Sequence, residues 1–206
     1  MSMQFDGIER RVSPSMVVGV GASAGGVEAL CALVGALPES FGGSMIVVLH
    51  TSSKGIGTLV NVLGRAGALH VEMATDRTVL RRQTIYVAPH DRQLVLTGRL
   101  IRLTDDPPQH GYRPAIDATF ASLASFHGLA AGVLLSGTLS DGTRGLLVLK
   151  AAGGTALVQD PAEAQHAGMI RSAQRAVAID ATLPVLGLAA RLVKSSLDLD
   201  TRQPAV

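Results

Sequence analysis

Short apolar runs alternate with amphipathic stretches along the chain from Met16 onward. This alternation is typical of repeated strand–helix–strand units around a mainly parallel sheet. The sequence therefore predicts an α/β fold. The apolar runs predict strands at 16–22, 45–50, 84–88, 131–136 and 155–159, with weaker strands near 70–74 and 177–180.

The stretches between these runs predict helices. The segment 25–38 carries apolar residues at a spacing of three or four and ends before Pro38. Two alternating runs around Thr97-Gly98-Arg99 instead predict a β-hairpin that adds antiparallel strands to the sheet. Further helices are expected at 55–67, at 115–128 with Gly128 at its end, and at 141–154, 167–177 and 183–197.

Length and composition bound the domain organisation. With 206 residues, 47% of them hydrophobic, the chain is long enough for one domain with a substantial core. We expect a polar N-terminal tail over 1–15, one domain over 16–197 and a C-terminal tail over 198–206. The proline-rich segment 105–117 predicts a long loop, which is either functional or a stiffened surface connection.

The same composition excludes several classes of function. The net charge is only +2 and no tryptophan is present, so we expect no nucleic-acid partner. The N-terminus has charges where a signal peptide is apolar, and no apolar run approaches the roughly 20 residues of a membrane span, so no membrane insertion is expected. Cys31 is the single cysteine, which excludes an internal disulfide and favours a cytoplasmic protein.

A glycine-rich turn after the first predicted strand fits two motifs. Gly19-x-Gly21-x-x-Ala24 is typical of a dinucleotide-binding turn, in which the backbone approaches a pyrophosphate. Gly21-x-Ser23-x-Gly25 is typical of a nucleophile elbow, which presents a serine hydroxyl at a strand-to-helix turn. The turn alone does not choose between a nucleotide and a nucleophile.

The next strands favour the nucleophile. A dinucleotide site needs Asp or Glu at the end of the second strand, and this chain has His50 there. Three predicted strands end close to Ser23, His50 and Asp141, and carboxyl ends of parallel strands meet at one edge of the sheet. A serine, an imidazole base and an orienting carboxylate are the groups of nucleophilic catalysis, and the amide of Ala24 is a candidate oxyanion donor.

Each of these three residues also has a structural interpretation. Ser23 alone is more often a helix N-cap, His50 a satisfied strand-end residue and Asp141 a helix cap. Their joint placement at strand ends is what favours catalysis. The chain order Ser, His, Asp also differs from the Ser, Asp, His order of α/β-hydrolases, so the motif match does not indicate that family.

Several collinear motifs resemble one known family. They are "GVGASAGGVEAL", "VVLH", "IYVAPHDRQLVL", "DDPPQHGYRPAIDATFASLA", "GVLLSGTLSDGTRGL" and "AAGGTALVQDPAEAQHAGMIRSA". Together, from about Val17 to about Leu192, they resemble the catalytic domain of the chemotaxis protein-glutamate methylesterases, the CheB type. The resemblance implies a three-layer, doubly wound αβα sandwich. It also implies hydrolysis of glutamate γ-methyl esters on chemoreceptor helices, with glutamine deamidation as a second activity of many members.

The resemblance assigns further site residues. The family's nucleophile, histidine and aspartate fall on Ser23, His50 and Asp141. Departures concern the surroundings of this triad rather than the triad itself. The residues expected to bind substrate or its oxyanion are Ala24 (often Thr in the family), Gly25, Tyr112 (often His), Arg113, Thr138 and Met169, which opens Met169-Ile170-Arg171-Ser172 where the family has Met-Pro-Arg-Ser.

The resemblance also suggests partners. We expect a methyl-accepting chemotaxis receptor as protein substrate and no cofactor. Many members carry an N-terminal receiver domain, for which the roughly fifteen residues before the first strand leave no room. A separate receiver-domain or methyltransferase protein is therefore a candidate partner. The remaining histidines lack zinc-site spacing, and no metal is expected.

Two other classes of function stay open at this point. One is a related serine esterase or amidase that acts on another substrate by the same mechanism. The other is a non-catalytic module that binds receptor helices, with a nucleotide-binding module as a third and more distant possibility.

Overall fold

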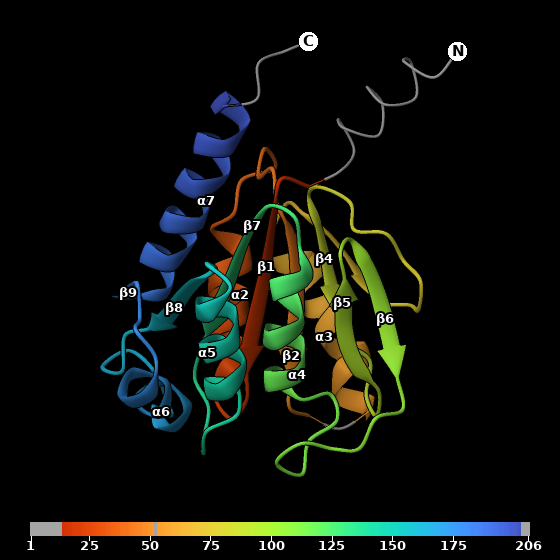
Figure 1. Cartoon of the computed structure of the whole chain (residues 1–206), viewed down its shortest axis with the longest axis vertical. Coiled ribbons are helices and arrows are strands. Elements are labelled where there is room, and N and C mark those ends of the chain that lie inside the picture. Colours follow the sequence, from red (N-terminus) through yellow and green to blue (C-terminus); the bar gives the residue numbers. More distant parts are fainter. Residues whose placement is uncertain (1–13, 52, 203–206) are drawn as a thin grey trace.

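The computed structural model describes residues 14–51 and 53–202. Its centre is a seven-stranded sheet in which neighbouring strands run parallel, in the order β3-β4-β2-β1-β7-β8-β9 (Figure 1). The strands are β1 (Met16–Ala22), β2 (Ser44–Leu49), β3 (His70–Met73), β4 (Thr84–Val87), β7 (Leu129–Leu134), β8 (Thr155–Gln159) and β9 (Ala181–Leu183). The predicted α/β fold with a parallel sheet is confirmed.

The central strands are apolar because both of their faces are covered. Every residue of β1 and of β2 is buried, as expected for the middle of a parallel sheet between two helical layers. On one face, α2 (Gly26–Gly35), α3 (Ser53–Ala66) and α7 (Val185–Arg202) pack on side chains such as Val18 and Val47. The three layers of Figure 1 thus follow from the apolar runs.

The opposite face is covered by shorter elements. Buried side chains of β1 and β2, such as Val17 and Ile46, share an apolar cluster with Phe120, Leu146 and Ile170 of these covering helices. The covering helices are α4 (Ile116–Ser122), the 3₁₀ turn η1 (Leu123–Ser125), α5 (Thr143–Ala151) and α6 (Gly168–Ala176). Among residues 14–51 and 53–202, no helix combines the length and the apolar character needed to cross a membrane.

The predicted hairpin forms, but its placement in the main sheet was wrong. β5 (Gln93–Thr97) and β6 (Leu100–Thr104) make a separate two-stranded antiparallel sheet. Hydroxyl groups of α4 form hydrogen bonds with the backbone of β5. Thr119 Oγ1 donates to Leu94 O at 2.7 Å, and Leu96 N donates to Ser122 Oγ at 2.8 Å. The hairpin edge is therefore bonded to a helix rather than to another strand.

Three boundaries also differ from prediction. α4 ends at Ser122 and continues as a 3₁₀ turn, so Gly128 is not its cap. The last strand lies at Ala181–Leu183 rather than 177–180. α7 continues to Arg202, past the expected domain end at 197. Residues 1–13 of the expected N-terminal tail lie outside the described residues.

Candidate active site

The three predicted catalytic residues follow the carboxyl ends of neighbouring strands. Ala22 of β1 pairs with Leu49 of β2, and His50 N donates to Ala22 O at 3.2 Å. Ser23 and His50 therefore follow paired residues on strands that lie about 4.8 Å apart. β7 pairs with β1 on its other side, and the loop after β7 leads to Asp141.

The carboxylate of Asp141 is buried and fully hydrogen-bonded. Its side chain is 2% exposed, and His50 Nε2 lies 2.9 Å from Oδ2. Oδ2 also accepts from Ile116 N at 2.8 Å, while Oδ1 accepts from Asp117 N and Gly142 N at 2.9 Å each. Four N–H donors thus fix both oxygen atoms and aim one of them at the imidazole.

These contacts keep Asp141 ionised. Burial by itself raises the pKa of this carboxyl group, but the hydrogen bonds from His50 and from the amides of Ile116 and Asp117 outweigh burial. The net result is a pKa below the ordinary value of 3.8. A carboxylate held in this way can stabilise the imidazolium that forms when His50 takes a proton.

Asp141 caps a helix, but not α5, the helix that it precedes in the sequence. α5 has Gly142 as its N-cap with no side-chain cap hydrogen bond, and Asp141 instead accepts from the first amides of α4. Asp117 of α4 in turn accepts from Gly145 N of α5 at 2.7 Å. Each helix thus receives a carboxylate from the segment of the other, which locks the two helix starts together at the sheet edge.

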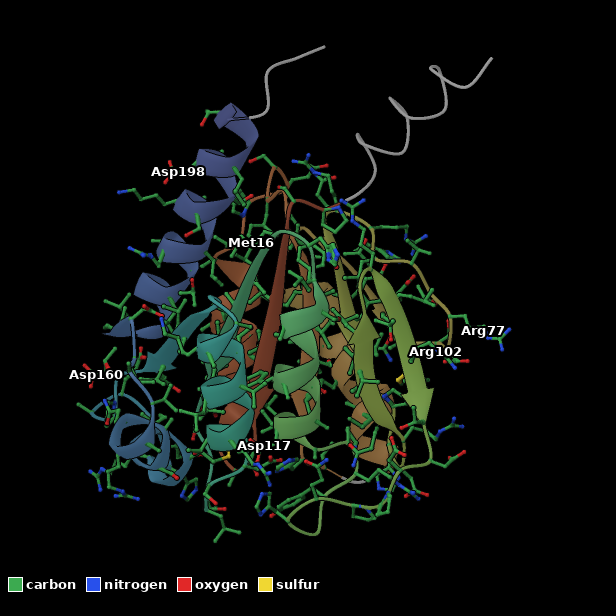
Figure 2. All side chains as sticks on the ribbon, in the orientation of Figure 1. Met16, Arg77, Arg102, Asp117, Asp160 and Asp198 are labelled. Atoms are coloured by element: carbon green, nitrogen blue, oxygen red, sulfur yellow. The ribbon has the colours of Figure 1, made fainter. Side chains whose placement is uncertain are left out.

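Asp117 is a second buried carboxyl group behind the triad. Figure 2 shows it at the N-terminal end of α4, on the side of the molecule toward which the arrow of β1 points in Figure 1. Burial raises its pKa, and the nearby charge of Asp141 acts in the same direction, against the opposing hydrogen bond from Gly145 N. His110 Nε2 lies 3.2 Å from Asp117 Oδ2 and partly offsets this charge.

His50 is held on two sides. With Nε2–H donating to Asp141, Nδ1 is the nitrogen that is left to accept a proton. The ring of Tyr112 stacks on the imidazole at a centroid distance of 3.7 Å and an interplanar angle of 2°. The His50 side chain is only 5% exposed, so these two contacts fix the orientation of the imidazole.

The turn that carries Ser23 is held through its backbone. Ser23 N donates to Ser136 O at 2.9 Å, and the buried Ser136 Oγ donates to Ala24 O at 2.8 Å. His166 N donates to the same Oγ at 2.9 Å. Within residues 14–51 and 53–202 the Ser23 hydroxyl makes no hydrogen bond, and α2 has Gly25 rather than Ser23 as its N-cap. The hydroxyl is thus available to a base or a substrate.

Two amide groups beside Ser23 are available for an oxyanion. Gly26 N is taken by Ser23 O at 2.9 Å. The amides of Ala24 and Gly25 have no acceptor in the described part of the chain. They follow Ser23 just before α2, a position from which backbone amides can stabilise a tetrahedral intermediate if Ser23 is the nucleophile.

Gly25, whose amide belongs to this pair, also has a backbone conformation and surroundings that require glycine. Gly25 has φ +70°, and a Cβ on it would lie 2.2 Å from Gln165 Oε1. The space beside Gly25 is therefore filled by the Gln165 side chain. Both the backbone conformation and this close approach require glycine.

The other predicted substrate-binding residues divide into two groups. Thr138 is exposed in the loop between β7 and Asp141, and Tyr112 covers His50. Met169 is fully buried, and its sulfur would lie 2.3 Å from a Cβ on Gly137, so it packs against the loop that follows β7. Arg113 is engaged by Asp91 at 2.6 Å and anchors the long loop.

A cavity of about 190 Å³ adjoins this edge. It lies beside the stacked rings of His50 and Tyr112, and Ser23 does not line it. The cavity therefore lies between the proline-rich loop and the base. Its lining residues are Leu49, His50, Thr51, His90, Asp91, Pro108, Gly111, Tyr112, Arg113 and Pro114.

One cluster of metal-ligand types is present in the described residues. Ligand atoms of His110, Asp117 and Asp141 lie within 4.8 Å of one another. Both oxygens of Asp141 already accept N–H donors, as does Asp117 Oδ1 from Gly145. The lone pairs that a cation needs are committed to hydrogen bonds, so the cluster fits a carboxylate network better than a metal site.

The sequence alone missed three residues that shape the site: Ser136, Asp117 and Gln165. Ser136 directly follows the apolar run of β7, a position where a polar residue was a usable signal. Asp117 and Gln165 act through segments distant in sequence, and no local pattern indicates their contacts. Fold and site together define an α/β domain with a Ser-His-Asp arrangement at the carboxyl edge of a parallel sheet.

Comparison with known proteins places this domain in a family. The CheB methylesterase family model matches residues 18–192, and the chain belongs to this family. The crystal structure of the Thermotoga maritima CheB methylesterase catalytic domain aligns with a TM-score of 0.84 and 28% identity, covering 89% of this chain and 100% of that one. The resemblance in the sequence motifs and the three-layer fold are confirmed.

Curated relatives of this chain are named as protein-glutamate methylesterases. A "Protein-glutamate methylesterase/protein-glutamine glutaminase 2" of Anaeromyxobacter dehalogenans is 38% identical over 181 residues, which cover 87% of this chain and 53% of the relative. A relative from the group 3 operon of Rhizobium meliloti is 34% identical, over 86% of this chain and 51% of its own length. The chain spans about half the length of these relatives.

Proposed function

We propose that this protein is a protein-glutamate methylesterase that hydrolyses glutamate γ-methyl esters on a chemoreceptor. His50 Nδ1 takes the proton of Ser23 as Oγ attacks the ester carbonyl carbon. The tetrahedral intermediate collapses to a Ser23 acyl-enzyme, and His50 returns the proton to the departing methoxy group, which leaves as methanol. Water repeats the cycle, giving the free glutamate carboxylate and regenerating the serine.

The observation that carries this proposal is the buried His50–Asp141 hydrogen bond of 2.9 Å, at the end of the strand next to the one that leads to Ser23, whose hydroxyl has no hydrogen-bond partner in the described residues, in a CheB methylesterase family domain. An ionised, immobile carboxylate holds the imidazole in the tautomer that accepts a proton. The free amides of Ala24 and Gly25 are the candidate oxyanion donors. Removal of one such donor slows related reactions by roughly a hundredfold or more.

A second activity at the same site is favoured by the relatives' names, which include protein-glutamine glutaminase. A glutamine side chain has the same acyl group as the ester, with ammonia as the leaving group. We propose that Ser23 and His50 deamidate receptor glutamines by the same steps. Release of ammonia from a receptor fragment with glutamine at its methylation positions tests this activity.

The proposal extends to partners and compartment. The protein substrate is a methyl-accepting chemotaxis receptor, esterified by a methyltransferase. A separate receiver-domain protein is the candidate that controls access to the site. The single cysteine fits a reducing compartment, and we place the reaction in the cytoplasm.

The test is methanol release from a receptor fragment esterified with radiolabelled methyl groups. The wild-type chain should release methanol, and Ser23→Ala should abolish the release while it retains the fold. Equal rates for the two proteins would refute the serine mechanism. A fluorophosphonate that labels the wild type and not Ser23→Ala identifies the nucleophile directly.

Two outcomes of this test favour the alternatives. Labelling of Ser23 without methanol release, together with hydrolysis of another ester in a panel, indicates a related esterase or amidase. Binding of the receptor fragment without labelling indicates a non-catalytic module. A thermal shift with NAD, NADP or ATP would favour the nucleotide-binding module.

A further inference from the structure

Exposed apolar side chains occur on α5 and in the loop that leads to it from β7. Seven large hydrophobic side chains are exposed in the described residues, and three of them are Leu139, Leu147 and Val148, at 68%, 49% and 42%. Leu139 lies in the loop before α5, and the other two lie on α5. Together with the exposed Arg144 and Arg171 they form what we call the α5–α6 face.

Leu139 adopts a conformation that leucine disfavours. Its φ is +65°, in the left-handed region where Cβ crowds the backbone. The side chain gains little from packing, because about two thirds of it is exposed. An exposed, bulky residue in this region next to an active site is an outlier that points to function rather than to stability.

The two arginines lie at one junction of helices. α5 and α6 pack together, and Thr143 Oγ1 lies 3.0 Å from Ser172 Oγ (Figure 1). Arg144 and Arg171 are the chain neighbours of these two residues. Neither guanidinium forms an ion pair with another residue of 14–51 or 53–202, so both charges are free to meet an external partner.

The α5–α6 face continues directly into the nucleophile turn. A Cβ on Gly168, the first residue of α6, would lie 3.1 Å from Leu139 N. A Cβ on Gly137 would lie 3.0 Å from the Cβ of Ser23. The loop that carries Leu139 thus connects the start of α6 with the nucleophile, within reach of a segment bound to Ser23.

We propose that the α5–α6 face docks an acidic segment of the substrate protein, whose carboxylates pair with Arg144 and Arg171 and whose apolar side chains cover Leu139, Leu147 and Val148. This proposal rests on the proposed function. In a segment that has one esterified glutamate among unmodified glutamates, carboxylates lie next to the reacting ester. Their charge is complementary to the two guanidinium groups of Arg144 and Arg171. Arginine pairs with carboxylates in a bidentate way, which fixes the register of the bound segment.

The proposal is tested by binding and turnover with the radiolabelled receptor fragment. Arg144→Glu combined with Arg171→Glu should raise KM about tenfold and leave kcat unchanged, because rim charges act on encounter and docking rather than on the chemical step. The wild-type KM should rise with salt, and the charge-reversed variant should lose this dependence. Leu139→Gly, which relieves the strained φ, should raise KM and preserve the melting temperature.

Matched controls come from α7, on the opposite face of the sheet. Arg191→Glu reverses an exposed charge there, and Leu186→Ser removes a 65% exposed leucine. Both controls should leave KM within twofold of wild type. Fluorophosphonate labelling of Ser23 should proceed at the wild-type rate in all variants, which verifies an intact nucleophile.

Binding in a Ser23→Ala background separates this proposal from the proposed function. The Kd of the esterified fragment should rise about tenfold when Arg144 and Arg171 are reversed and should not change with Arg191→Glu. An unchanged Kd and KM would overturn the docking proposal even if methanol is released. Failure of wild type to release methanol, with Kd still sensitive to the two arginines, would overturn the proposed activity and support the docking surface.

Discussion

The two ends of the candidate triad are held in opposite ways. At the carboxylate end, Asp141 is 2% exposed and accepts four N–H donors at 2.8–2.9 Å. At the nucleophile end, Ser23 is fixed only through its backbone, and its hydroxyl has no partner in the described residues. This difference fits a site in which the base is preorganised. The hydroxyl of the candidate nucleophile stays free to transfer its proton to the base and to attack the substrate.

Replacement of Asp141 should have the largest effect, because it disturbs the rigid end. Asp141→Asn replaces an acceptor-only carboxylate by an amide that donates from one side, so that either His50 or the α4 amides lose their acceptor. We expect kcat for methanol release to fall about 10⁴-fold, as for the corresponding change in other serine triads.

The control for this change is Asp180→Asn. Asp180 is a more exposed carboxylate that binds Lys150 Nζ at 2.9 Å, and its replacement should leave kcat unchanged. If Asp141→Asn retains more than a tenth of the wild-type kcat, the carboxylate is not the orienting group.

Ser136→Ala disturbs the other end, where only the backbone holds the nucleophile. The substitution removes the acceptor of His166 N and the donor to Ala24 O. We expect a loss of about 1–3 kcal/mol in the free energy of unfolding. Misplacement of Ser23 should reduce kcat by roughly 10- to 100-fold, as measured by denaturant unfolding and methanol release.

Ser44→Ala is the matched control. Ser44, the first residue of β2, is also fully buried, but its Oγ has no hydrogen-bond partner in the described structure. Its removal should leave stability unchanged or raise it, because no bond is lost and an unsatisfied hydroxyl is removed. Equal losses for the two variants would indicate that Ser136 contributes only by packing.

Gly25→Ala tests the Ser23 end of the candidate triad by steric clash. The new Cβ meets a positive φ and the Gln165 side chain, whereas Gly98→Ala meets a positive φ with nothing within 4 Å. The φ penalty, about 1–2 kcal/mol, should appear in both variants. Gly25→Ala should lose more stability and also lose activity, and activity should be partly restored by an added Gln165→Ala. If the two glycine variants unfold alike, the Gln165 contact carries no energy.

The sequence predicted the three candidate catalytic residues because their positions depend on where the strands end. Ser23, His50 and Asp141 directly follow or lie near predicted strand ends, and a parallel sheet brings such ends together. Ser136 and Asp117 were missed because their partners, Ala24 O and Gly145 N, are brought to them only by tertiary packing. The hairpin was misplaced for the same reason, since hydroxyl groups of α4 compete for its edge.

The smallest predicted effect concerns the two buried carboxyl groups, whose pKa values are shifted in opposite directions. The pKa of Asp141 is lowered, so its contribution to stability is complete above the ordinary value of 3.8 and is lost as pH falls through the lower folded value. Burial raises the pKa of Asp117, so the fold favours its protonated form and loses stability as pH rises from 3.8 through the higher folded value.

Asp117→Asn should therefore gain stability relative to wild type as pH rises across the window above 3.8, because an amide keeps an oxygen acceptor for Gly145 N without a charge beside Asp141. His110→Gln should have the opposite effect, since it removes the group that offsets the Asp117 charge at 3.2 Å. The His110 side chain is 52% exposed, which makes its contribution small. Denaturant unfolding of the three proteins between pH 3 and 8 measures how the free energy of unfolding changes with pH in each. Parallel curves would mean that ionisation of Asp117 does not affect the stability of the fold.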